Sequence, residues 1–364
     1  MNCVSFLPNR YSRREDSRPG QWTRYFLLLP MVFSLGVPTC GSKDTGRPGP
    51  LPPGLTDDQA RMLESLEKID DYPLYVLKYT CGYGFSDYLK RGISGSPTAA
   101  ESNPEAKENG WQCTSFVSFG THQAVFGHNF DWHNRESLLL FTDPPDGYAS
   151  VAMVDMFYCF NRRQSTLDSL EDRKGLLNAP YCPFDGMNEK GVAIGLMSVP
   201  HAEPPRNPKK ITIDNLAVIR LVLDHAASVP EALELMGSCN VHFSQVPLHY
   251  LVADRSGRSL IVEYYRDQVK TFPGNGSSQV CTNFILAEAG QVQNRQCWRY
   301  DLASRLLKKT GGNLSLKQGM KILKKVSQPH TVWSIVYDLH TGQVAVTMGR
   351  KYRTLHRFHL PLTP

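Results

Sequence analysis

The pattern of apolar and polar positions changes near residue 113. Before that point, one apolar run, Tyr25–Val37, is followed by a Pro- and Gly-rich stretch at 41–54 that has no apolar periodicity. Beyond it, short β-type runs alternate with segments of helical period, in the order strands, two helices, strands, two helices, strands. The pattern predicts an N-terminal extension followed by one large domain, with no internal repeat.

The elements expected in the large domain follow from these runs and from the turn residues between them. Strands are expected at Thr114–Phe119, Gln123–Phe130, Tyr148–Tyr158, Val192–Ser198, Tyr250–Asp254, Ser259–Tyr264, Val280–Leu286, Val332–Asp338 and Val344–Met348. Helices are expected at Asp214–Ala227, Val229–Met236, Gln296–Lys308 and Ser315–Val326. Gly191 is expected to take a positive φ in the turn before the strand that starts at Val192.

The segment just before the large domain has its own helix signal. Thr56-Asp57-Asp58-Gln59 has the form of a capping box, and apolar residues continue at helical spacing to Ile69. These features predict a helix over Thr56–Asp70. The aromatic stretch Tyr72–Tyr88 is expected to pack on a neighbouring element, and the polar stretch Gly92–Gly110 to form an exposed loop.

The apolar run Tyr25–Val37 follows a cluster of arginines and is shorter than the roughly 20 residues that span a bilayer. It suits the hydrophobic region of a signal peptide, so residues 1–40 are expected to act as a targeting segment. Cys40 and the linker 41–55 are together similar to a bacterial lipoprotein attachment site, although lipidation of Cys40 is left open. We expect an exported protein, either secreted or held at the cell surface or membrane.

Composition and charge narrow the class of protein. Hydrophobic residues make up 41% of the 364 residues, enough to fill a core, so a wholly disordered chain is excluded. The formal net charge of +6 is small for this length, and no basic run is interleaved with aromatic residues, which argues against nucleic-acid binding. The nine cysteines show no CxxC pair and no zinc-site spacing, so mostly free thiols and no metal or other cofactor are expected.

Four short strings carry the chemistry that the sequence suggests. They occur in the order Cys113-Thr114-Ser115-Phe116, Gly127-His128-Asn129-Phe130-Asp131-Trp132, Gly186-Met187-Asn188-Glu189-Lys190-Gly191 and Cys281-Thr282-Asn283. Each string is weak alone. Together they resemble the choloylglycine hydrolase and acid-ceramidase superfamily, which includes bile salt hydrolases, penicillin V acylases and related linear amide C–N hydrolases. The resemblance covers the chain from about Cys113 to its C-terminus.

The resemblance implies an α+β, four-layer αββα sandwich, the fold of N-terminal-nucleophile hydrolases. It also implies that the precursor cleaves itself between Gln112 and Cys113, so that residues 56–112 form a pro-segment and 113–364 the catalytic domain. A free α-amine with a pKa of about 7.7–8.0 can take a proton from a thiol whose pKa is about 8.5. Cys113 would then hold both nucleophile and base, with no catalytic histidine.

The remaining site residues follow from the same resemblance. Asp131 would hold the α-amine and orient the thiol. Asn283 would donate to the oxyanion that forms during acyl transfer, and Arg299 would stabilise charge near Cys113. The other pocket positions implied are Ser198, which stands where bile salt hydrolases have an oxyanion-hole Asn, His128, which stands where the family usually has Arg, and Trp132.

Four interpretations of the function stay open at this stage, one of which, a papain-like protease, would leave Cys113 internal and require a catalytic histidine. The leading interpretation is a self-processing amidase that hydrolyses a linear, non-peptide amide bond of a small N-acyl compound through an acyl-thioester on Cys113. An acyltransferase on the same fold would need the same intermediate. An inactive, surface-tethered binding protein is the third, and the intact set of site residues argues against it. The sequence leaves the acyl and amine groups of the substrate, and the oligomeric state, undetermined.

Overall fold

The computed structural model describes residues 51–95, 112–133, 135–160, 166–244, 246–288 and 297–364. The targeting segment expected at 1–40, with Cys40, lies outside the described residues, as do most of the linker at 41–55 and most of the loop expected at Gly92–Gly110. Within the described ranges, no helix has the length and apolar character needed to cross a membrane.

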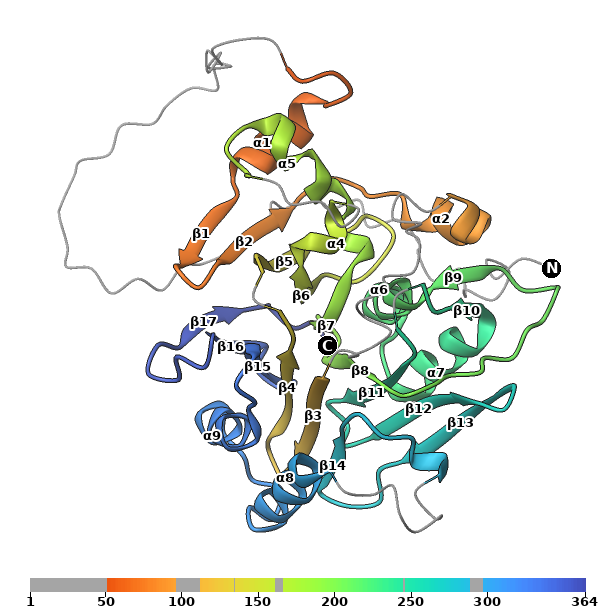
Figure 1. The fold of residues 1–364 in the computed structure, drawn as a ribbon, viewed down its shortest axis with the longest axis vertical. Coiled ribbons are helices and arrows are strands. Elements are labelled where there is room, and N and C mark those ends of the chain that lie inside the picture. Colours follow the sequence, from red (N-terminus) through yellow and green to blue (C-terminus); the bar gives the residue numbers. More distant parts are fainter. Residues whose placement is uncertain (1–50, 96–111, 134, 161–165, 245, 289–296) are drawn as a thin grey trace.

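Two β-sheets form the centre of the molecule (Figure 1). The six-stranded sheet has the order β14 (Ser278–Cys281), β3 (Gln112–Phe119), β4 (Ala124–Asp131), β15 (Thr331–Asp338), β16 (Gln343–Met348) and β17 (His356–His359). The nine-stranded sheet has the order β1 (Glu67–Asp70), β2 (Leu74–Tyr79), β5 (Ser137–Thr142), β6 (Ser150–Asp155), β7 (Pro183–Asn188), β8 (Val192–Ser198), β11 (Leu248–Asp254), β12 (Ser259–Tyr265) and β13 (Gln268–Pro273).

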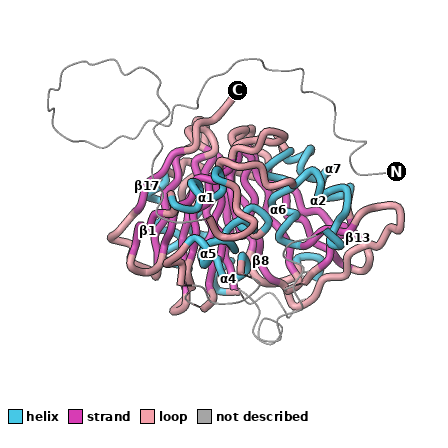
Figure 2. Tube along the Cα trace, turned by 90° about the horizontal axis from the view of Figure 1, so that it is seen from above, coloured by secondary structure: helices cyan, strands magenta, loops and turns pink. Residues whose placement is uncertain are grey.

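The two sheets pack face to face, with β3 of one against β8 of the other. Gly195 of β8 marks the contact, because a Cβ there would lie 2.8 Å from Nδ1 of His128 on β4 and 3.2 Å from Oγ of Ser115 on β3. A side chain larger than hydrogen at 195 would therefore push the sheets apart. Figure 2 shows the strands gathered in the middle of the molecule, with helices around them.

Helices cover the outer faces of both sheets. α8 (Trp298–Lys308) and α9 (Leu316–Val326) pack on the six-stranded sheet, and α6 (Asn215–His225) and α7 (Val229–Ser238) on the nine-stranded one. This is the four-layer αββα arrangement that the sequence predicted. The short elements are α1 (Asp57–Glu64), α2 (Phe85–Arg91), α4 (Met156–Cys159), α5 (Leu170–Arg173), the 3-10 turns at Gly92–Gly95, Lys174–Tyr181 and Leu286–Glu288, and the parallel pair β9 (Thr212–Asp214) and β10 (Asn240–His242).

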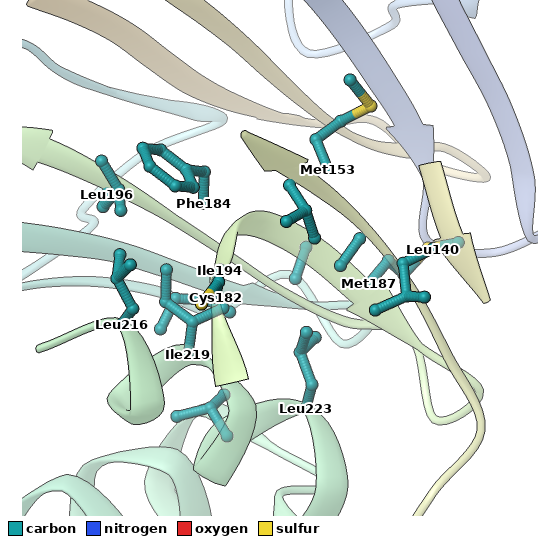
Figure 3. Packing of buried hydrophobic residues seen from close by; sticks show 14 of the residues in the cluster. Leu140, Met153, Cys182, Phe184, Met187, Ile194, Leu196, Leu216, Ile219 and Leu223 are labelled. Carbon is teal, nitrogen blue, oxygen red and sulfur yellow. The ribbon is translucent and has the colours of Figure 1, made fainter. Parts of the chain in front are cut away.

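Part of the main hydrophobic cluster lies between α6 and the nine-stranded sheet (Figure 3). Leu216, Ile219 and Leu223 come from one helix, and Ile194 and Leu196 from the strand beneath it, and all five side chains are at most 2% exposed. Burying an aliphatic side chain of this size contributes about 1.5–3 kcal/mol. The amphipathic period of the helix therefore stabilises the fold through this packing.

Local signals placed the helices and several strands correctly. All four helices expected in the large domain form, and the Ser315 and Thr56 capping boxes are present. The hairpin formed by β3 and β4 is observed with Cys113 opposite Phe130. Gly191 has the expected positive φ of 72°, and a Cβ there would lie 2.5 Å from the carbonyl oxygen of Leu339.

The helix expected over Thr56–Asp70 is wrong in its second half, because α1 ends at Glu64. The chain then forms β1, which pairs with β2 through the register Lys68↔Tyr75. Strand pairing and burial of Leu66 and Ile69 against the core outweigh their helical spacing, which is a weak signal by comparison. Two expected strands, Tyr148–Tyr158 and Val280–Leu286, also end early, at Asp155 and Cys281.

The segment before Gln112 is joined to the large sheet. β2 pairs in parallel with β5, so this segment forms one edge of the nine-stranded sheet. The aromatic stretch packs on a neighbour, as expected: Tyr88 meets Tyr181 edge-on with ring centroids 5.4 Å apart, and the hydroxyl of Tyr83 donates to Asp224 of α6 at 2.7 Å.

Candidate active site

Cys113 is the second residue of β3, and its thiol is fully buried. Strand pairing places it between β14 on one side and β4 on the other. Burial raises the pKa of the Cys113 thiol well above its usual value, and the nearby Asp131 carboxylate raises it further. The Arg299 guanidinium and a hydrogen bond from the Ser198 backbone lower this pKa in part.

Asn283 follows β14 and connects Cys113 to the opposite sheet. Its Oδ1 accepts the backbone N–H of Cys113 at 2.9 Å. Its Nδ2 donates to the carbonyl oxygen of Ser198 at 2.8 Å and to the Ser198 hydroxyl at 3.2 Å. Because β14 pairs with β3 and Ser198 ends β8, the two sheets together fix the amide plane of Asn283.

Arg299 places a buried cation beside the same peptide. It lies in the first turn of α8, with 6% of its surface exposed. Its Nη1 donates to the carbonyl oxygen of Cys113 and, at 2.9 Å, to Oγ1 of Thr114. Its Nη2 donates to Oδ1 of Asn283 at 2.9 Å. The guanidinium thus touches the backbone and the amide that surround the thiol.

Asp131 ends β4, directly opposite Gln112 in the strand register. Its carboxylate accepts from the hydroxyl of Thr331 and, at 2.9 Å, from Nε2 of Gln328, and it lies 3.9 Å from Nη1 of Arg299. Burial raises the pKa of Asp131, while these hydrogen bonds and the arginine lower it. The structure therefore brings the four residues predicted to be catalytic into one cluster, in which Cys113, Asp131 and Arg299 are buried and Asn283 is part-buried.

His128 and Trp132, the two other pocket residues predicted in this part of the chain, have different surroundings. His128 is fully buried between the sheets, where its Nδ1 is 2.8 Å from the Ser115 hydroxyl and its Nε2 is 3.9 Å from Asp185. Burial lowers the pKa of His128 to about 3, so this ring is neutral and does not supply the positive charge of an arginine. Trp132 packs edge-on against His133, with ring centroids 4.6 Å apart.

Gln328 is a site residue that the sequence did not reveal. Its Nε2 lies 2.6 Å from Oε1 of Gln112 and 2.9 Å from Oδ2 of Asp131, so one amide holds both side chains. It precedes β15, whose first residue, Thr331, pairs with Asp131. No local motif marks Gln328, and only the pairing of β15 with β4 brings it to the site.

The chemical groups of this cluster suit acyl transfer. They comprise a thiol, a carboxylate, a carboxamide and a guanidinium within one network, the combination needed for a nucleophile and for stabilising an oxyanion. In the part of the chain that the structure describes, no group of three or more His, Cys, Asp or Glu side chains is arranged to hold a metal ion.

Comparison with known proteins identifies a matching family model. The model for linear amide C–N hydrolases, choloylglycine hydrolase family, matches residues 113–299. The matched stretch begins at Cys113 and ends at Arg299, and so includes all four residues of the cluster. No curated protein sequence matches the chain.

Two solved structures of enzymes are similar to parts of this chain. A mutant of the conjugated bile acid hydrolase from Clostridium perfringens is similar with a TM-score of 0.51 and 15% identity, over 68% of this chain and 92% of that one. Penicillin V acylase from Agrobacterium tumefaciens is similar with a TM-score of 0.47 and 20% identity, over 65% of this chain and 83% of that one. At these identities, the first of the two supports the fold alone.

Proposed function

Because the chain belongs to the linear amide C–N hydrolases of the choloylglycine hydrolase family, a class of enzymes that hydrolyse linear amide bonds, we propose that it is a self-processing cysteine amidase. Cys113 is the proposed nucleophile, freed as an N-terminal residue by cleavage of the Gln112–Cys113 bond. The observation that carries the proposal is the set of contacts on this residue: Asn283 binds its N–H and Arg299 its carbonyl oxygen.

The proposed maturation proceeds by an N-to-S acyl shift. The Cys113 thiol loses its proton and attacks the carbonyl carbon of Gln112, the peptide C–N bond breaks, and the nitrogen takes up a proton to become the α-amine. Water then hydrolyses the thioester, which leaves a carboxylate on Gln112 and a free thiol on Cys113. Gln328 supports this step because it holds the Gln112 side chain against β15.

The proposed hydrolysis of substrate uses the same thiol with its new base. The α-amine of Cys113 takes the thiol proton, and Asp131 stabilises the resulting ammonium group. The thiolate attacks the acyl carbon of an N-acyl compound, and the amide N–H groups of Asn283 and the Ser198 backbone donate to the oxyanion. Collapse expels the protonated amine and leaves an acyl-thioester, which water hydrolyses. Hydrolysis returns the enzyme and a carboxylic acid.

Mass spectrometry of the purified protein tests the proposal. The wild type is expected to contain a chain that starts at Cys113, whereas Cys113→Ala should remain a single uncut chain of full length. Cys239→Ala is the matched control, because Cys239 is a buried thiol away from the cluster; this variant should be cut and active. Wild-type protein that hydrolyses amides at full rate while uncut would show the mechanism to be wrong.

A further inference from the structure

A buried histidine–glutamate pair lies directly behind Asn283. His249 of β11 is fully buried and Glu263 of β12 is 3% exposed, and the antiparallel register of the two strands brings them together. Nδ1 of His249 is 2.9 Å from Oε1 of Glu263. Nε2 of His249 is 2.6 Å from the carbonyl oxygen of Thr282, the residue before Asn283.

The partners of the ring fix where its protons are. A carbonyl oxygen only accepts, so Nε2 must carry the hydrogen that it donates to Thr282. The Glu263 carboxylate accepts two backbone N–H groups, from Leu286 at 2.7 Å and from Ala287 at 3.0 Å, and such bonds favour its ionised form. Nδ1 faces a carboxylate oxygen that can accept its hydrogen bond, so the geometry suits a ring that carries a proton on each nitrogen.

The neighbouring thiol does not disturb this assignment. Sγ of Cys281 lies 3.3 Å from Nε2 of His249. Burial raises the pKa of the Cys281 thiol well above its usual value, so this sulfur is uncharged. The nearest anion to the ring is therefore Glu263, and the shortest contact of Nε2 is the one to Thr282.

We infer that His249 is a positioning residue for the amide hydrolysis, an inference that rests on the function proposed above. Its Nε2–H holds the carbonyl of the Thr282–Asn283 peptide, the unit from which the Asn283 side chain extends. His249 belongs to the nine-stranded sheet and Thr282 follows a strand of the six-stranded one, so the bond fixes the peptide across the gap between sheets. The Asn283 amide is thereby held at both Cys113 and Ser198.

A pair of near-isosteric substitutions separates this role from a merely structural one. In His249→Gln, the side-chain amide can reach the position of Nε2 and keep the bond to Thr282, while the bond to Glu263 is lost. In His249→Asn, the amide occupies the position of Nδ1 and keeps Glu263, while the bond to Thr282 is lost. Both variants remove the same positive charge, so their difference reports on the Thr282 contact.

The measurements are kcat and KM on penicillin V and on a glycine-conjugated bile acid, per mole of folded chain that starts at Cys113. His249→Asn should lower kcat about 10–100-fold with KM changed by less than about threefold, whereas His249→Gln should keep kcat within about fivefold. His225→Gln, at the end of α6, is the control and should match the wild type. Equal losses of kcat in both His249 variants, or a lower Tm with kcat unchanged, would overturn the inference.

A spectroscopic measurement decides the charge without reference to activity. In protein labelled with ¹⁵N-histidine at pH 7, the signals lost in His249→Gln should show a proton on both ring nitrogens. A neutral ring there would overturn the assignment. Wild-type protein that stays uncut and hydrolyses neither compound would instead contradict the proposed amidase function, and the role of His249 in hydrolysis with it, even if the imidazolium is observed.

Discussion

Two buried arginines differ in their surroundings: Arg220 lies in the hydrophobic core, and Arg299 lies at the candidate active site. Arg220 of α6 is fully buried and donates to Asp224, one helical turn away, at 2.9 Å, and to the hydroxyls of Thr142 and Ser150. Arg299 instead donates to the Cys113 carbonyl and to Asn283, and its carboxylate neighbour is 3.9 Å away.

The difference lies in what neutralises each charge. The Arg220 cation has a carboxylate in direct contact, and its other hydrogen-bond acceptors are hydroxyl and carbonyl oxygens, so its charge is locally compensated. The Arg299 cation contacts the peptide of the proposed nucleophile. The nearest carboxylate, that of Asp131, instead accepts hydrogen bonds from Gln328 and Thr331. A buried arginine is therefore a sign of chemistry when its nearest acceptors are neutral.

Arg299→Met should produce the largest effect. Removing the cation leaves Cys113, Asn283 and Asp131 without the charge that joins them, so kcat should fall about 10³-fold or more, consistent with loss of one or more transition-state donors. Steady-state kinetics on protein of known folded fraction provides the measurement. A lower Tm with an unchanged kcat would show that Arg299, like Arg220, has a structural role only.

Arg220→Met should have its main effect on stability. The substitution strands the Asp224 carboxylate in a buried site, and such a loss typically costs about 3–5 kcal/mol. Urea unfolding measures it. Activity per folded molecule should equal that of the wild type, and Asp224→Leu added to Arg220→Met should recover part of the lost stability. A loss of kcat comparable to that of Arg299→Met would show that Arg220 also contributes to the reaction and not only to stability.

His128→Gln should change the pH dependence of stability. The pKa of His128 is lowered to about 3 by burial, below its unfolded value of about 6.5. The unfolded chain therefore binds more protons between these values, so the wild type loses stability as pH falls below 6.5, by about 2 kcal/mol at pH 5. The variant lacks this loss, and the gap between the two unfolding free energies should close in acid. A constant gap from pH 7 to pH 5 would contradict the buried neutral ring.

Gln328→Ala should have the smallest effect of the four. The substitution removes the hydrogen bonds of Gln328 to the Gln112 side chain and to one oxygen of Asp131. The Asp131 carboxylate can then move toward Arg299. Appearance of the chain that begins at Cys113 should slow about tenfold, as expected for loss of positioning without loss of a reacting group. A time course by mass spectrometry measures this, with Gln343→Ala, at the exposed first position of β16, as the matched control.

Local signals account for much of the fold and for the choice of the four residues that the structure brings together in the candidate site. An amphipathic period specifies α8, and a capping box together with an amphipathic period specifies α9, in both cases from neighbouring residues alone. β5 and β7 were missed because both are buried on both faces and lack the alternation of a half-exposed strand. The structure shows a strand at Glu67–Asp70 where helical spacing predicts a helix, because pairing with β2 is a long-range interaction.

The supporting residues of the site lay beyond sequence reasoning. Gln328 reaches Asp131 through strand pairing across 197 positions, and His249 reaches Thr282 across a gap between two sheets. Neither belongs to a short motif. Cys113, Asp131 and Asn283 were predicted because each lies in a recognisable string, and Arg299 because the family resemblance extends to it. The residues that hold these four in place are specified only by the tertiary register.

The parallel pairing of β2 with β5 has a consequence for the proposed cleavage before Cys113. If the bond before Cys113 is cut, two strands of the large sheet, β1 and β2, belong to a separate polypeptide that non-covalent contacts alone hold in place. Reassembly after unfolding then becomes a bimolecular reaction that depends on dilution, while the precursor refolds as a single chain. Persistence of the cut enzyme would be set by how slowly it opens, a kinetic rather than an equilibrium property.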